Sequence, residues 1–280
     1  MTAPDIMTLL GCQIDIPTMT SSIERDAHLA ATANKVRKQL SDQHADLVIL
    51  PELSSLDYAR ATFDCLHELA EPLAGASFEI WRDVAHEYET FISYGFARQD
   101  QNGTFICTAI VNPDGDLIGH YDKLHLTQYG ASMEKDYFQR GNYLFTFNIK
   151  QFCLAPIICY DIRMPELTRT LTLDHGVDVI LHGGAYFRDP SFLSWHAFAT
   201  TRAIENQVFL MSLNRAGKNY GSSLFCWPWM DETIEPVAFA ETQEDFKFVT
   251  INKDMMLDVR REYAFLKDRL DDYALPLMAD

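Results

Sequence analysis

The sequence lacks a basic excess: 23 lysine and arginine residues stand against 40 aspartate and glutamate residues, and the net charge is −17. A chain this acidic repels nucleic acids and anionic membranes. It also lacks any apolar run that reaches the roughly 18 residues of a membrane span, and residues 1–5 carry no basic region of the kind that begins a secretory signal. The sequence therefore predicts a cytoplasmic protein that binds neither nucleic acid nor membrane.

The six cysteines form no CxxC pair and lie mostly in apolar stretches. This spacing is typical of neither a zinc site nor a disulfide framework, so reduced thiols are expected. His120 and His125 fit neither one face of a helix nor alternate positions of a strand, so no metal and no other cofactor is expected. Five of the cysteines are expected to fill the core, namely Cys12, Cys65, Cys107, Cys153 and Cys226.

What the sequence does hold is enough apolar material for a large core. With 48% hydrophobic residues among 280, and with no internal repeat or linker, a single domain over residues 1–280 is expected. Helices that alternate with paired strands indicate an α+β architecture. Periodicity and capping signals, with a capping box from Ser21 to Glu24, predict helices over 22–40, 77–89, 165–175, 191–206 and 254–261. Strands are predicted over 7–13, 47–50, 91–97, 105–111, 117–121, 152–159, 177–181, 208–213, 224–227 and 246–251.

The longest apolar strand ends at a cysteine. The run from Phe152 to Ile158 has no polar alternation, which is typical of a strand covered on both faces. Cys159 follows, the chain then turns polar, and Pro165 suits the first position of a helix. A thiol at such a strand-to-helix elbow lies beside free backbone N–H groups and the positive end of a helix, which favour a thiolate and an oxyanion. Cys159 is therefore the candidate nucleophile.

Two other stretches place charged residues at strand ends. Residues 45–53 read ADLVILPEL, so Glu52 would lie at the buried rim of a sheet, where burial raises the pKa of a carboxyl group toward the range of a general base. Residues 121–126 read YDKLHL, which places Lys123 between an aromatic-rich strand and two leucines. Because ammonium groups are rarely buried alone, Lys123 needs a carboxylate nearby. The loop over 127–141 is long for a simple connection and is expected to rim the site.

These phrases resemble the carbon-nitrogen hydrolase (nitrilase) superfamily, in its small amidase-like branch. The resemblance lies in PE at 51–52, KLHL at 123–126 and CYDIRMPEL at 159–167, which follow the superfamily's order of Glu, Lys and Cys. It continues through Glu134 and Gly141, which fit the second glutamate of the superfamily and the glycine after it. Further matches lie at Trp195 and over 202–206, 214–217 and 221–223, so the resemblance spans nearly the whole chain.

The resemblance implies a fold and a set of roles. It implies a four-layer αββα sandwich of two mixed β-sheets, in which Cys159 attacks the substrate and Glu52 accepts the thiol proton. Lys123 and the backbone N–H of Tyr160 would hold the oxyanion, and Glu134 would orient the lysine and the substrate.

Assembly is a second implication of the resemblance. Relatives form stacked dimers, so a homodimer or larger homo-oligomer is expected. In relatives a comparable C-terminal tail crosses to the partner subunit, and residues 262–280 are the corresponding segment here.

The residues after the cysteine favour an amide as substrate. Nitrilases of the superfamily usually have Trp-Glu after the cysteine, whereas residues 159–163 look like the small amidases, including the omega-amidase type. The expected reaction cleaves a small amide to a carboxylate and ammonia through a thioester. N-carbamoyl or nitrile hydrolysis by the same triad is the alternative, and an inactive relative used as a binding protein is an alternative of another class. The candidate substrate-binding residues are Tyr58, Tyr160 and Tyr186.

His182 offers a second interpretation of the nucleophile. It follows the strand over 177–181 at the same sheet edge as Cys159, so a Cys and His dyad is conceivable. A papain-like dyad brings its own local cysteine phrase, which is missing here, and the triad is therefore preferred. The segment at His182-Gly183 and the segment over 227–231 depart from the superfamily pattern, so no relative's specificity can be transferred to this chain.

Overall fold

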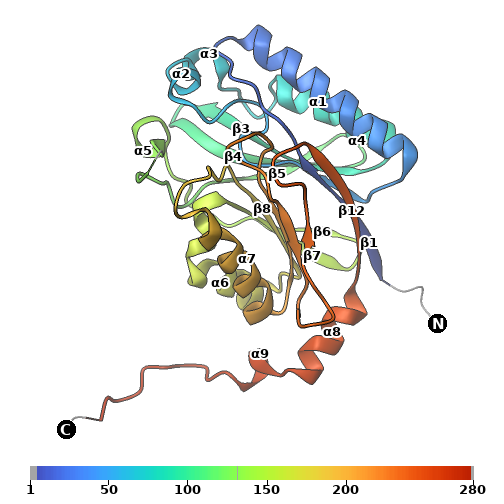
Figure 1. The fold of residues 1–280 in the computed structure, drawn as a ribbon, viewed down its shortest axis with the longest axis vertical. Coiled ribbons are helices and arrows are strands. Elements are labelled where there is room, and N and C mark those ends of the chain that lie inside the picture. The colour runs from blue at the N-terminus through green and yellow to red at the C-terminus, as the bar shows by residue number, and fades with distance from the viewer. Residues whose placement is uncertain (1–4, 131, 279–280) are drawn as a thin grey trace.

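Two mixed six-stranded sheets pack face to face in the computed structural model, which describes residues 5–130 and 132–278 (Figure 1). The strand order of the first sheet is β12-β1-β2-β3-β4-β5, and that of the second is β11-β10-β9-β8-β7-β6. The first sheet holds β1 (Ile6–Gln13), β2 (Leu47–Ile49), β3 (Phe91–Asp100), β4 (Gly103–Val111), β5 (Leu117–Asp122) and β12 (Asp245–Asn252). The second holds β6 (Phe147–Ile149), β7 (Phe152–Ile158), β8 (Val179–Gly183), β9 (Phe209–Leu213), β10 (Leu224–Cys226) and β11 (Val237–Ala238).

The centre of each sheet is parallel and its edges are antiparallel. In the first sheet β1, β2 and β3 run parallel, and in the second β7, β8 and β9 do so. The carboxyl ends of parallel strands meet at one edge of a sheet, and polar residues that follow such strands gather there. Glu52 follows β2 and Cys159 follows β7, so each sheet delivers one candidate residue in this way.

Helices cover the outer face of each sheet and complete four layers. Helices α1 (Ser22–Asp42) and α4 (Ala76–Tyr88) lie on the first sheet, and α6 (Pro165–His175) and α7 (Phe192–Asn206) lie on the second (Figure 1). The shorter helices are α2 (Arg60–Phe63), α3 (Leu66–Leu69), α5 (Glu134–Tyr137), α8 (Lys253–Glu262), α9 (Phe265–Asp268) and the 3₁₀ helix η1 (Cys159–Arg163). The predicted four-layer α+β sandwich in a single domain is confirmed.

Three apolar layers hold the four structural layers together. Val48 packs toward α1 and α4, while its neighbours Leu47 and Ile49 face the second sheet. Leu154 in β7 faces the first sheet, and Ala155 faces α6 and α7. The strands are apolar on both faces because both faces are covered, which is why their sequences show continuous apolar runs.

Local sequence signals set several element boundaries. The Ser21 side chain accepts a hydrogen bond from the Glu24 backbone N–H, and the Glu24 carboxylate accepts one from the Ser21 N–H, so the predicted capping box is present. Pro165 occupies the first turn of α6, and Gly176 ends that helix with a φ of 65°. Proline has no backbone N–H, so none is left unpaired in the first turn of the helix. Glycine has no Cβ, so it adopts the left-handed conformation after the last turn without a steric clash.

The structure corrects several sequence predictions. Cys65 and Cys153 are only half-buried, so they do not fill the core as Cys12, Cys107 and Cys226 do. The loop over 127–141 contains the short helix α5, and the hairpin strands β3 and β4 extend nearly to their turn. The short edge strands β6 and β11 were not predicted, because three and two residues carry too little periodicity to be recognised.

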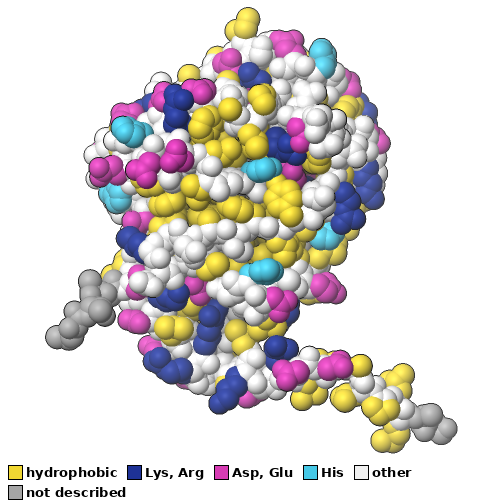
Figure 2. Space-filling model, turned by 180° about the vertical axis from the view of Figure 1, so that it is seen from behind, with side chains coloured by type: hydrophobic (Ala, Val, Ile, Leu, Met, Phe, Trp, Pro, Cys, Tyr) yellow, Lys and Arg dark blue, Asp and Glu magenta, His cyan; other side chains and the backbone are white. Residues whose placement is uncertain are grey.

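The C-terminal segment leaves the body of the domain beyond α8 (Figure 1). Several of its apolar side chains are exposed, up to 98% for Met278, and Figure 2 shows them standing away from the domain surface. Within 5–130 and 132–278, none of the helices combines the length and apolar character needed to span a bilayer.

Candidate active site

A buried lysine lies between two buried carboxylates at the carboxyl edge of the first sheet. The Lys123 Nζ is 2.7 Å from Glu52 Oε1 and 2.7 Å from Glu134 Oε1, and each of the three side chains is at most 1% exposed. Glu52 follows β2, Lys123 follows β5, and Glu134 begins α5. The structure therefore brings together three sequence-predicted residues that lie up to 82 positions apart, as Glu52 and Glu134 do.

Glycines let the backbone approach this group closely. A Cβ on Gly183 would lie 2.8 Å from the Glu52 backbone nitrogen, so only glycine lets β8 pass beside Glu52. A Cβ on Gly141 would lie 2.2 Å from the Asp122 carbonyl oxygen, while the Gly141 N–H donates to the Lys123 carbonyl at 2.8 Å. Gly141, which the resemblance singled out together with Glu134, thus holds the backbone of Lys123 in place.

The Glu134 carboxylate has partners on both oxygens. The Thr127 backbone N–H donates to Oε2 at 2.9 Å, and the Tyr58 hydroxyl donates to Oε1 at 2.7 Å. The Ser132 hydroxyl oxygen lies 2.7 Å from that of Tyr58. The predicted substrate-binding Tyr58 therefore touches Glu134 and lines the cavity described below.

Burial sets the protonation behaviour of the cluster. Burial raises the pKa of Glu52 to about 7, against the lowering effect of Lys123. The pKa of Lys123 lies well above its usual range, because its two carboxylates outweigh burial. Burial and the charge of Glu52 raise the pKa of the Cys159 thiol. A protonated thiol beside a carboxyl group that titrates near neutral pH needs that group as its base.

Cys159 occupies a strained backbone elbow. Its φ is 47°, a left-handed conformation that a non-glycine residue adopts only when surrounding contacts enforce it. Asp161 supplies some of these contacts: its carboxylate accepts hydrogen bonds from the Ile158 N–H at 3.0 Å, the Tyr121 hydroxyl at 2.8 Å and the His125 N–H at 3.0 Å. The turn that presents the thiol is therefore held from both sheets.

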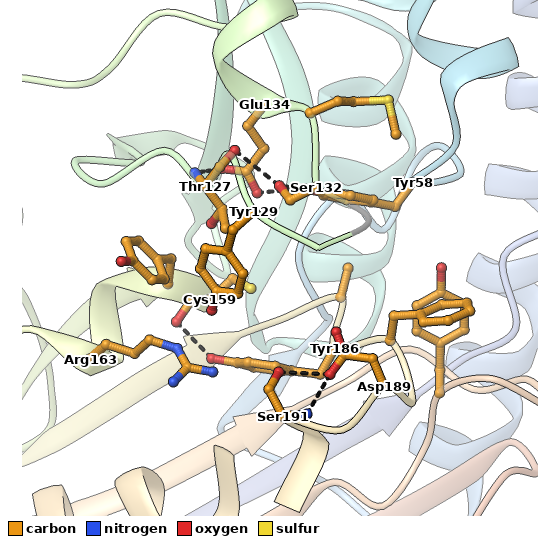
Figure 3. Close-up of a pocket in the computed structure, with 15 residues that line it drawn as sticks. Tyr58, Thr127, Tyr129, Ser132, Glu134, Cys159, Arg163, Tyr186, Asp189 and Ser191 are labelled. Atoms are coloured by element: carbon orange, nitrogen blue, oxygen red, sulfur yellow. Dashed lines mark hydrogen bonds between the residues drawn. The ribbon is translucent and has the colours of Figure 1, made fainter. Parts of the chain in front are cut away.

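A cavity of about 220 Å³ opens above Cys159 (Figure 3). Tyr58, Tyr160 and Tyr186 all line it, so the structure brings the three candidate substrate-binding residues to one place. The loop over 127–141 rims the cavity, as predicted, through Thr127, Tyr129, Ser132, Met133 and Glu134. The sequence did not mark the remaining lining residues, because nothing identifies an isolated loop residue as facing a cavity. These are Arg163, Ala185, Phe187, Asp189, Ser191 and Tyr220.

His182 is close to Cys159 but turned toward its backbone. Its Nε2 lies 3.1 Å from the Cys159 carbonyl oxygen, and its Nδ1 lies 2.7 Å from the Ser212 hydroxyl. Burial lowers the pKa of His182 to about 4. The geometry does not support the Cys and His dyad, because both ring nitrogens are already engaged. Within the described part of the chain, no group of three or more His, Cys, Asp and Glu residues is arranged to hold a metal ion.

The sequence and the fold of this chain are similar to those of known proteins. The family model described as carbon-nitrogen hydrolase matches residues 12–260. A nitrilase from Pyrococcus abyssi is 31% identical over 83% of this chain and 91% of its own length. A human omega-amidase is 26% identical over 94% of this chain and 96% of its own. A crystal structure of a member of branch 10 of the nitrilase superfamily from Saccharomyces cerevisiae, 22% identical, has a TM-score of 0.82 and covers 94% of this chain and 96% of that one.

Proposed function

This chain belongs to the carbon-nitrogen hydrolase family, and on that premise we propose that it cleaves a small amide to a carboxylate and ammonia through a thioester on Cys159. The observation that carries the proposal is the buried Lys123 ammonium group, paired with Glu52 and Glu134 beside the cavity that Cys159 lines. Burying three charged groups is costly, and they persist in proteins where their chemistry is used.

Acylation needs a base, a nucleophile and a site for the oxyanion. Glu52 Oε2 is buried and has no hydrogen-bond partner among the described residues, so it is the oxygen that accepts the Cys159 proton. The thiolate sulfur attacks the carbonyl carbon. Lys123 has three N–H donors, of which two are used by Glu52 and Glu134, and the third donates to the oxyanion together with the Tyr160 N–H.

Collapse of the tetrahedral intermediate breaks the carbon–nitrogen bond. The proton held by Glu52 passes to the departing nitrogen, which leaves as ammonia. Water then attacks the thioester carbon while Glu52 takes one of its protons, and that proton returns to the cysteine sulfur as the acid is released. The same carboxylate therefore acts in both halves of the reaction.

The cavity favours a small substrate with a negative group. Its volume of about 220 Å³ suits a compact substrate. Arg163 lines it, is half-buried and forms no ion pair with a described acidic residue; its guanidinium group contacts the Ser194 hydroxyl and the Phe198 ring. An unneutralised guanidinium group fits a carboxylate. We infer that the substrate is a short amide that also carries a carboxylate.

A substrate screen and mass spectrometry test the proposal. Ammonia release is measured for monoamides of short dicarboxylic acids, for neutral amides of equal length, and for N-carbamoyl compounds and nitriles. We expect the carboxylate-bearing amides to react fastest, and an acid quench to reveal an acyl adduct on the peptide that contains Cys159. A protein that releases ammonia from none of these compounds and forms no adduct would be an inactive relative. If the carbamoyl compounds or the nitriles reacted faster than the amides, that class of compound would be the substrate class in place of the amides.

Assembly and compartment are part of the same proposal. We infer a homodimer or larger homo-oligomer, in which the exposed apolar side chains of the tail, including Leu275 and Leu277, pack on a partner subunit. We also place the protein in the cytoplasm, which is supported by six cysteines that form no disulfide and by the net charge of −17.

A further inference from the structure

A buried chain of hydrogen bonds approaches the nucleophile from the second sheet. The Trp195 Nε1–H donates to the Ser212 Oγ at 2.8 Å, and that Oγ lies 2.7 Å from His182 Nδ1. His182 Nε2 lies 3.1 Å from the Cys159 carbonyl oxygen. Trp195, Ser212 and His182 are completely buried, so bulk water cannot replace any of these hydrogen bonds. Their register is set by the sheet, because His182 on β8 is paired with Ser212 on β9.

The two ends of this chain fix the direction of its bonds. The Cys159 carbonyl oxygen can only accept, so His182 Nε2 carries a proton and donates it to that oxygen. In a neutral imidazole Nδ1 is then the acceptor, and it accepts from the Ser212 hydroxyl, whose oxygen in turn accepts from the indole N–H of Trp195. Burial, which lowers the pKa of His182 to about 4, keeps the ring neutral at physiological pH.

Tyr186 donates to the same carbonyl from a second direction. Its hydroxyl lies 2.8 Å from the Cys159 oxygen, and its ring stacks on Trp195 with centroids 4.6 Å apart and planes 7° apart. Asn214 holds the Tyr186 backbone with two hydrogen bonds, accepting from its N–H at 2.8 Å and donating to its carbonyl at 3.0 Å. Trp195 thus supports both donors: it is linked to His182 by hydrogen bonds through Ser212, and it stacks directly on the ring of Tyr186.

The carbonyl that receives these two bonds belongs to the peptide group whose N–H is that of Tyr160. In a trans peptide the C=O and the N–H point in opposite directions. Donors on the oxygen therefore fix the orientation of the N–H and polarise it into a stronger donor. The left-handed φ of 47° at Cys159 needs this kind of external restraint.

We propose that His182 and Tyr186 are positioning residues that grip the Cys159 carbonyl from behind and so aim the Tyr160 N–H at the oxyanion of the substrate. The inference rests on the proposed function, in which that N–H stabilises the tetrahedral intermediate. Neither residue exchanges a proton with the substrate through this contact. His182 was a candidate partner of the Cys159 thiol in the sequence, but it instead acts on the backbone carbonyl of Cys159.

Kinetics with two reactions of the same thiol test this role. Amide hydrolysis passes through an oxyanion, whereas alkylation of Cys159 by iodoacetamide is a displacement at a saturated carbon and needs none. In His182→Leu we expect kcat to fall roughly 10- to 100-fold, a part of the loss seen when an oxyanion donor is removed. The KM and the alkylation rate of the Cys159 peptide, followed by mass spectrometry, should stay within about 3-fold of wild type.

Matched variants separate aiming from folding. His182→Gln retains an N–H donor and should recover most of the lost kcat, while Tyr186→Phe, which keeps the stacked ring, should lose kcat as His182→Leu does. His196→Leu is the control, because His196 also bonds a backbone carbonyl, that of Ser222 at 2.7 Å, and should leave kcat unchanged. In nitrogen-labelled protein the His182 ring should show the Nε2–H tautomer and no titration between pH 5 and 9, an interval of about 4 pH units that lies above its lowered pKa.

Several outcomes would overturn the inference without touching the proposed function. An unchanged kcat in both His182→Leu and Tyr186→Phe would do so, as would a parallel loss of kcat and alkylation, which would mean that the thiol itself is displaced. Equal activity of the Gln and Leu variants would show that the donor is immaterial. The proposed function fails on a different result, namely amide hydrolysis that persists in Cys159→Ala.

Discussion

The two sheets approach Cys159 from opposite sides and bury polar groups in different ways. On the side of the first sheet Glu52, Lys123 and Glu134 are charged groups in direct contact, with N–O distances of 2.7 Å. On the side of the second sheet His182 and Ser212 are neutral and joined by directed hydrogen bonds. Both sides are almost completely inaccessible to solvent.

The difference follows from what each side must do. A proton has to move on the first side, so a group with a pKa near neutrality is needed, and burial of a carboxyl group beside a cation provides it. On the second side only orientation is needed, and neutral donors give orientation without the desolvation cost of an ion. The comparison predicts that single substitutions on the charged side are far more damaging than those on the neutral side.

Lys123→Met should have the largest effect. It leaves Glu52 and Glu134 as two buried carboxyl groups without their cation, so we expect a loss of about 3–5 kcal/mol of unfolding free energy. The rate of amide hydrolysis should fall at least about 10³-fold, because an oxyanion donor is lost as well. Thermal denaturation and ammonia release measure the two effects.

Lys35→Met is the matched control for that substitution. Lys35 also forms a 2.7 Å ion pair, with Glu244, but its side chain is 41% exposed. Loss of this pair should change the unfolding free energy by about 0–1 kcal/mol and leave activity intact. Equal destabilisation by the two substitutions would show that burial does not distinguish the Lys123 cluster.

Cys159→Ala should abolish hydrolysis while changing stability by less than about 1 kcal/mol, because a thiol at the cavity wall contributes little packing. Cys226→Ala reverses this pattern, since Cys226 is fully buried in the core of the second sheet and takes no part in the proposed chemistry. Enzyme assays and denaturation of both variants check the contrast. Residual hydrolysis by Cys159→Ala above a few per cent of wild type would exclude this nucleophile.

Glu52→Gln should reduce the rate by roughly 10²- to 10⁴-fold, as expected for loss of a general base. In the wild type the rate should rise with pH through the raised Glu52 pKa of about 7, since only the ionised form accepts a proton. Stability has the opposite dependence. A carboxyl group whose pKa is raised from 4.5 to about 7 on folding contributes stability that is present at pH 4.5 and is lost as the pH rises through 7.

The same substitution provides the check on this pH dependence. Rate profiles and thermal denaturation from pH 5 to 9, about 4 pH units around the Glu52 pKa, should both lose this step in Glu52→Gln. A wild-type rate that does not change across this range would contradict the assignment of Glu52 as the base.

Glu134→Gln should be milder and should differ in kind. Its carboxylate is held by Thr127 and Tyr58 and touches Lys123, so an amide can replace part of its contacts. We expect KM to rise at least as much as kcat falls. If this variant instead blocked acylation while Glu52→Gln still gave a full burst of acyl-enzyme, the two glutamates would exchange roles.

Removal of residues 262–280 should have the smallest effect on the chemistry. Neither side of Cys159 includes a residue of this tail, so the rate per active site should stay within about 2-fold when only distant contacts are lost. Assembly should weaken, because the exposed apolar side chains of the tail would lose their proposed partner. Sedimentation velocity at micromolar concentration measures this, and a truncated chain that assembles as well as the full one would show that the contact lies elsewhere.

Much of this molecule could be predicted from the sequence because its signals are local. Continuous apolar runs before Glu52 and Cys159 indicate strands covered on both faces, and both strands are buried in the structure. A Pro-Glu pair, a lysine before two leucines and a cysteine before an abrupt polar turn each mark a strand end. The short strands β6 and β11 could not be predicted, because three and two residues carry too little periodicity. The burial of Cys65 and Cys153 could not be predicted either, because it depends on how other segments pack against them.

The sequence by itself determined the longer elements, their order and which residue types stand at the strand ends, since these depend on periodicity within a few residues. Only the tertiary structure decided what those residues do to one another. Lys123 is kept charged because two distant segments deliver carboxylates to it, and the sequence could not show that Glu52 and Glu134 would both lie 2.7 Å away. His182 faces the backbone of Cys159 and not its sulfur because Ser212 and Trp195, from another strand and a helix, orient its ring. Distance and direction in a folded chain come from packing between segments, and no local pattern encodes them.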